Sequence, residues 1–247
     1  MWRPVAEAMT RLTRFARETV GLEEIGLGTV ENPDEYLAWA SSKTGPGVVD
    51  DIYLSLKGAA GALTVRIDRD EFHIVLGGAY RDRDEIEAAL AHELAHIKQH
   101  TEGLFPYGLK YPAGATRAVL LPLEIGAEEL VLRELPEIAL TRARMATREA
   151  RRWERTGNPA VDLDNSLVSV PITLAFERIG LDAKIPQPEV DEPYATVRRT
   201  LVRAARTTDP WNRKEVEAYC RMAAAEVAEL LTHHPETPHT TPHRSSR

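Results

Sequence analysis

Residues 82–99 constrain this chain more than any other segment, because an unbroken helical period there carries two closely spaced histidines. Apolar side chains recur every three to four positions, as in an amphipathic helix. Asp84 and Glu85 stand near the start, where the positive end of a helix dipole favours acids. His92 and His96 are four residues apart, so a helix places one imidazole a turn above the other on one face.

Short segments rich in β-branched and aromatic residues precede this helix. Residues 48–56, 63–67 and 72–76 are predicted strands, and the last two are close enough in sequence to form a hairpin. Further helices are expected over 3–20, from Pro33, and over 122–135, 138–155, 164–179, 194–207 and 213–231. The predicted fold class is therefore α+β, mostly helical, with a small twisted sheet.

Four parts are expected along the chain, without an internal repeat. Residues 1–47 are predicted N-terminal helices, 48–136 a core that holds the sheet and the histidine helix, and 137–231 a helical C-terminal region. Residues 232–247 are rich in His, Pro, Thr and Ser, a composition that predicts a disordered tail.

Composition excludes several classes of protein. No run of about 18 apolar residues occurs, so neither a transmembrane helix nor a membrane partner is expected. The first residues lack the apolar stretch of a secretory signal. Cys220 is the single cysteine, which excludes a disulfide framework and a cysteine-built zinc site and favours a reducing cytoplasm.

Arginine is concentrated in two stretches, 141–155 and 196–214, although the net charge of the chain is −7. We expect both to be solvated helix faces, because Arg is a good helix former. The alternative is a surface for an acidic partner or a phosphate backbone, but neither aromatic interleaving nor a known motif supports it. A nucleic-acid partner is therefore not expected.

The predicted helix over 82–99 contains the motif H-E-x-x-H, formed by His92, Glu93 and His96. Two imidazoles on one face can bind one Zn²⁺ ion at about 2.0–2.1 Å. Glu93 points beside the metal, where it can take a proton from a water molecule. The alternative is two ordinary surface histidines beside a salt-bridging glutamate, but the position in an amphipathic helix directly after a hairpin favours zinc.

Such a site needs a third protein ligand, and two places in the sequence offer one. Glu102 follows the motif closely, but its spacing requires a glycine for a sharp turn where Gln99 stands. The next predicted helix carries Glu124 and Glu128 on one face, with Glu129 beside them. Glu124 is the favoured ligand, with Glu128 or Glu129 as the alternatives. If Glu124 binds the metal, Glu128 is the acid expected to accept a hydrogen bond from a ligating histidine.

Two small residues, Gly126 and Ala127, lie between these acids. They would let the glutamate helix approach the histidine helix closely. The alternative is that the acids form a solvated helix face.

The motif H-E-L-A-H, followed 28 residues after His96 by E-x-x-A-E, resembles the gluzincin zinc metallopeptidases. Within that group it is most similar to the minigluzincins and the ImmA/IrrE-type regulatory peptidases. The resemblance covers roughly residues 60–135. It implies a zincin-like core, in which a small twisted sheet accompanies the H-E-x-x-H helix and a glutamate helix. The helical C-terminal region would be an extension of that core.

Residue by residue, the resemblance implies His92, His96 and Glu124 as zinc ligands and Glu93 as the general base. Glu128 stands where the family has Asp, which is a departure from the family pattern. The implied activity is hydrolysis of a peptide or protein substrate.

In that family the substrate adds as a strand to the edge of the sheet, and residues 72–76 are the matching segment here. Donors for the oxyanion are expected among Tyr107, Tyr111, His100 and Arg142. Two other functions stay open, namely a non-proteolytic metal-binding regulatory module and a non-peptidase tailoring metalloenzyme on the same scaffold.

Overall fold

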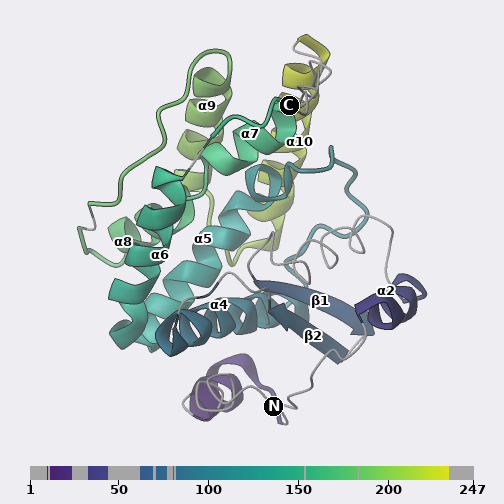
Figure 1. The fold of residues 1–247 in the computed structure, drawn as a ribbon, viewed down its shortest axis with the longest axis vertical. Helices are drawn as coiled ribbons and strands as arrows, with labels where there is room; N and C mark the ends of the chain where they lie inside the picture. Colours follow the sequence, from purple (N-terminus) through teal and green to yellow (C-terminus); the bar gives the residue numbers. More distant parts are fainter. Residues whose placement is uncertain are drawn as a thin grey trace, which may run out of the picture.

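The computed structural model describes residues 10, 12–23, 33–43, 62–68, 71–76, 80, 82–152, 154–182 and 184–233. Within these residues the chain is mostly helical and contains one two-stranded antiparallel sheet, so the α+β class is confirmed at this level (Figure 1). The predicted strand over 48–56, the first part of the predicted first helix (residues 3–9 and 11) and nearly all of the predicted tail lie outside the described residues.

The sheet is the hairpin that the sequence predicts. Strand β1 (Ala62–Asp68) pairs antiparallel with β2 (Glu71–Leu76), and Thr64 stands opposite Ile74 in the register. Ile74 packs against the cluster of apolar side chains around α4 (Arg83–Thr101). The face that holds Thr64 and Ile74 is therefore the face turned toward that helix.

The opposite face of the hairpin is covered by α2 (Pro33–Ser41). Val65 and Val75 form a small buried cluster there with Ala40 of α2. The Tyr36 hydroxyl also lies 2.9 Å from Nδ1 of His73, which fixes α2 against β2. Because successive side chains of a strand point to opposite faces, one hairpin can contact both α2 and α4.

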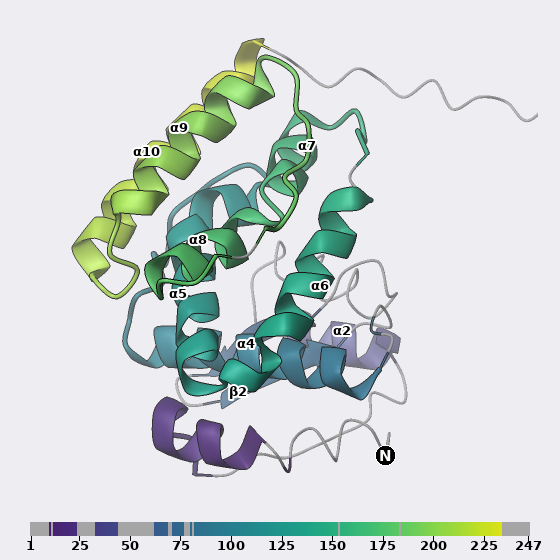
Figure 2. The same cartoon turned by 90° about the vertical axis from the view of Figure 1, so that its left-hand side faces the viewer.

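Helix α4 is the centre of the lower core (Figure 1). The side chain of Asp82 caps it by accepting a hydrogen bond from the Glu85 main-chain N–H at 2.9 Å. The N-terminal helical segment, which ends in η1 (Ala16–Val20), lies below α4 in Figure 2 and contributes Phe15 to the same core. With the hairpin, α5 and α6 also packed around it, α4 is buried along most of its length.

The glutamate helix is longer than predicted, because α5 runs over Thr116–Glu134 instead of starting at Pro122. A proline inside a helix cannot donate to the carbonyl four residues earlier and displaces it. The backbone bends accordingly at Leu120, and the Ala118 carbonyl accepts a hydrogen bond from the Tyr219 hydroxyl at 3.1 Å. A side chain from the far end of the chain thus satisfies the carbonyl that Pro122 leaves without its helical donor.

The remaining helices are η2 (Pro136–Ile138), α6 (Ala139–Arg151), α7 (Pro159–Ser166), α8 (Val170–Arg178), α9 (Tyr194–Thr207) and α10 (Arg213–His233). Of these, η2 and α6 pack beside α4, whereas α7 to α10 stand on the other side of α5 (Figure 2). The single helix predicted over 164–179 was wrong, because the chain forms α7 and α8 with a break at 167–169. The prediction over 194–207 is confirmed, while α10 extends two residues into the predicted tail.

Helix α5 contributes to two cores. Leu121 and Leu123 pack with α7, α9 and α10, whereas Ala127 and Val131 pack with α4. Gly126 lies between these two sets. A Cβ atom at this position would lie 2.7 Å from Cβ of Pro210 and 3.0 Å from Nε2 of Gln99, so the absence of a side chain is what permits the close approach.

We predict that Gly126→Ala destabilises the protein. Helix propensity alone would make this change stabilising by about 1 kcal/mol. The new methyl group meets the rigid ring of Pro210, and overpacking of this kind costs about 1–3 kcal/mol. Urea unfolding measures the net free energy, and an increase in stability would contradict the packing described for Gly126.

Candidate metal centre

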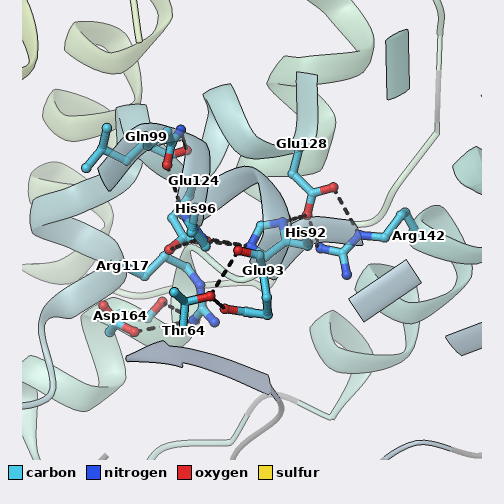
Figure 3. Close-up of polar contacts among 11 residues, drawn as sticks. Thr64, His92, Glu93, His96, Gln99, Arg117, Glu124, Glu128, Arg142 and Asp164 are labelled. Atoms are coloured by element: carbon cyan, nitrogen blue, oxygen red, sulfur yellow. Dashed lines mark hydrogen bonds and ion pairs between the residues drawn. The ribbon is translucent and has the colours of Figure 1, made fainter. Parts of the chain in front are cut away.

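Three side chains from two helices meet in the lower core (Figure 3). His92 and His96 extend from adjacent turns of α4, with their Nε2 atoms 3.1 Å apart. Glu124 reaches them from α5, with one carboxylate oxygen 3.3 Å from Nε2 of His92 and the other 3.6 Å from Nε2 of His96. One donor atom from each residue lies within 4.8 Å of the others. Two imidazoles and one carboxylate form a donor set that suits Zn²⁺ and leaves a coordination position for another ligand.

Behind His92 lies a buried ion pair between Glu128 of α5 and Arg142 of α6. A Glu128 carboxylate oxygen is 3.2 Å from Nδ1 of His92, on the side of the ring away from Glu124. Arg142 donates to both oxygens of Glu128 through Nε and a terminal nitrogen. Glu128 can therefore accept a hydrogen bond from Nδ1–H of His92, and Nε2 is the ring nitrogen that faces Glu124.

Behind His96 the corresponding partner is Gln99, a fully buried amide. Its Nε2 donates to the Leu123 carbonyl at 2.7 Å, and this contact fixes the orientation of the amide because a carbonyl can only accept. Its Oε1 consequently faces Nδ1 of His96 at 2.8 Å, so Nδ1 carries the proton and Nε2 is free to bind a cation. The sequence analysis used Gln99 only to argue against Glu102 and did not predict this contact.

Glu93 is buried but is not part of the three-residue group. The Thr64 hydroxyl of β1 lies 2.8 Å from its carboxylate and 3.0 Å from its main-chain carbonyl. The hairpin thus holds the side chain of Glu93 beside the histidines (Figure 3). Sequence reasoning missed Thr64, since a threonine inside a predicted strand carries no signal of its own.

The charges of the group are strongly coupled. Burial lowers the pKa of His92, but the nearby carboxylates of Glu128 and Glu124 outweigh burial and raise it to about 10. Burial raises the pKa of Glu124, but His96 and His92 outweigh burial and hold it well below its usual value. Without a cation, His92 therefore carries a proton between two carboxylates. A bound cation would replace that proton, because a ligating imidazole is neutral.

A second ion pair, which is partly buried, supports the start of α5. Arg117 lies 3.3 Å from a carboxylate oxygen of Asp164 in α7, and the other oxygen of Asp164 accepts from the Ala118 main-chain N–H at 2.9 Å. Asp164 thus takes the place of an N-cap residue, because Ala115 at that position has no polar side chain. The positive charge of Arg117 also contributes to the low pKa of Glu124.

The other acids considered as third ligands lie in separate contacts. Glu102 ends α4 and pairs with Lys98 at 2.7 Å. Glu129 pairs with Arg133 at 2.8 Å and with Arg178 at 3.6 Å. Neither belongs to the group formed by the two histidines and Glu124.

The expected oxyanion donors divide in a similar way. Arg142 is engaged by Glu128, whereas Tyr107 lies on the surface and is 59% exposed. The Tyr107 hydroxyl is 2.6 Å from Nδ1 of His100 and accepts from Arg66 at 3.0 Å. Burial, together with His96 and Arg66, lowers the pKa of His100 to about 3, so its ring is neutral. None of these contacts selects one donor among the candidates.

Comparison with models of protein families, with curated proteins and with solved structures finds no significant match for this chain. No helix in the described part of the chain is long and apolar enough to span a membrane.

We predict that Glu128→Ala strongly destabilises the protein. The change leaves the Arg142 guanidinium in a buried position without its carboxylate, and breaking a buried pair in this way costs about 3–5 kcal/mol. Glu217→Ala, which removes the partner of Arg213 on the surface, is the matched control and should have little effect. Equal losses in urea unfolding would show that the Glu128 contact has no special role.

Proposed function

We propose that this protein is a zinc-dependent peptidase. The observation that carries the proposal is the convergence of His92, His96 and Glu124, with Glu93 held beside them by Thr64. This donor set and a buried carboxylate next to it are what hydrolysis by an activated water requires. Two things support the proposal, namely this site and the resemblance of its motif to the gluzincins.

His92, His96 and Glu124 would hold the zinc ion, which would act as a Lewis acid on a substrate carbonyl and lower the pKa of a water molecule. Glu93 would take the proton of that water and give it to the leaving amine. Thr64 supports this role, because its hydroxyl holds the Glu93 carboxylate in place. Glu128 and Gln99 would fix the two imidazoles from behind.

A peptide substrate would lie in extended form along the hairpin and bind through main-chain hydrogen bonds. The sequence suggested residues 72–76, which form β2, as the strand for this contact. Thr64 of the paired strand β1 touches Glu93, so a substrate on this hairpin would lie close to the proposed base. The location that we propose is the cytoplasm, because the single cysteine, Cys220, is a buried free thiol.

The alternative is a binding module that keeps the metal and cleaves nothing, or a metalloenzyme that acts on another bond. The buried carboxylate of Glu93 favours an enzyme, since a module that only binds metal has no need of a base there. Cleavage of a diverse peptide library by the zinc-loaded protein separates these functions. Zinc binding without cleavage of any peptide would count against the peptidase.

We predict one zinc ion per chain in the purified protein, measured by elemental analysis. Glu124→Ala should lose the metal, because it removes one of three ligands. Glu102→Ala is the matched control and should retain it, since Glu102 pairs with Lys98. Retention of zinc by Glu124→Ala and its loss from Glu102→Ala would move the third ligand to the end of α4.

We predict that Glu93→Gln keeps its zinc and loses peptide hydrolysis. A general base contributes roughly 10²–10⁴-fold in rate, so kcat/KM should fall by at least about 10²-fold. The amide is similar in shape and can still accept from Thr64, so folding should be preserved. Wild-type activity in the variant would exclude Glu93 as the base, whatever its zinc content.

A further inference from the structure

A pocket of about 490 Å³ lies between α8 and α9, apart from the candidate metal centre. Its volume falls within the range of small-molecule sites, roughly 300–1,000 Å³. Aliphatic side chains form one part of its wall, namely Val170, Leu174, Ile185 and Val202. No aromatic ring of a described residue lines it, so these residues offer no stacking surface for a nucleobase.

The rim of this pocket carries four arginines of α9, from the second of the two arginine-rich stretches. Arg199 pairs with Glu192 at 2.8 Å and Arg206 with Glu177 at 3.1 Å. Arg198 and Arg203 form no ion pair with a described residue. Glu177 also lines the pocket, but its carboxylate pairs with Arg206. The expectation that this stretch is merely a solvated face is therefore incomplete, because Arg198 and Arg203 border the pocket without an ion pair to a described residue.

Arg198 is held in a fixed position beside the pocket. One of its terminal nitrogens donates to Oε1 of Gln187 at 2.5 Å, and Nε2 of Gln187 donates to the Thr173 hydroxyl at 3.0 Å. Its Nε is buried and has no hydrogen-bond partner in the described part of the chain. Burial lowers the pKa of this guanidinium, and no acid compensates. A desolvated charge without a counter-ion is a cost that an anion bound at the pocket side of the guanidinium would reduce.

We propose that this pocket binds an aliphatic carboxylate, such as a medium-chain fatty acid. Its chain would lie against Val170, Leu174 and Val202, and its carboxylate would face Arg198 and Arg203. The planar fork of a guanidinium matches a carboxylate, and an aliphatic wall matches an alkyl chain. The site is independent of the proposed peptidase activity.

Calorimetric titration of the full chain with decanoate tests this proposal. Decanoate should bind, octanoate should bind about 10-fold more weakly because two methylenes are lost, and decanol should bind far more weakly than decanoate. Arg198→Gln should weaken decanoate binding by about 10-fold or more. Val202→Phe should also weaken it, because the ring fills the apolar wall while every charge stays in place.

Two controls locate the binding. Arg213→Gln removes a surface arginine of α10 that pairs with Glu217 and should not change the affinity. His96→Ala should bind decanoate as well as the wild type does, because the pocket lies apart from the metal centre. If decanoate bound at the metal centre instead, this variant would lose it. The proposal is wrong if decanoate does not bind, if decanol binds equally well, or if His96→Ala abolishes binding while Arg198→Gln does not.

Discussion

The close packing of α5 on α4 is the contact on which the candidate site depends. Gly126 makes it possible, because any side chain there would meet Pro210 and Gln99. Glu124 and Glu128 stand two residues before and after this glycine, so the same approach brings one acid to each side of the His92 ring. Without it, the two histidines would share a helix face with no carboxylate opposite them.

Contacts of the C-terminal helices with α5 support the candidate site. Arg142 of α6 neutralises Glu128, and Asp164 of α7 holds the first turn of α5. Tyr219 of α10 satisfies the carbonyl that Pro122 leaves free. The C-terminal helices are therefore part of what positions Glu124, and one face of α9 borders a separate pocket.

The parts of this structure that depend on local periodicity could be predicted from the sequence. The histidine helix, the hairpin and the helix over 194–207 follow from the spacing of apolar residues. The convergence of Glu124 on the two histidines was suggested by spacing and by the family resemblance. Gln99 and Thr64 were missed, because their roles come from the neighbours that tertiary packing gives them. The start of α5 was predicted too late, at Pro122, for a similar reason. The hydrogen-bond partner of the freed Ala118 carbonyl is Tyr219, which lies 101 residues away in the sequence.

X-ray absorption at the zinc edge, on protein loaded with one equivalent of zinc, tests the central claim most directly. The account predicts two imidazole nitrogens and one carboxylate oxygen at about 2.0–2.2 Å, with no sulfur. Loss of one imidazole contribution in His96→Ala would assign it to the motif. A zinc–sulfur distance near 2.3 Å, which would require Cys220, or a spectrum unchanged in His96→Ala would contradict the account.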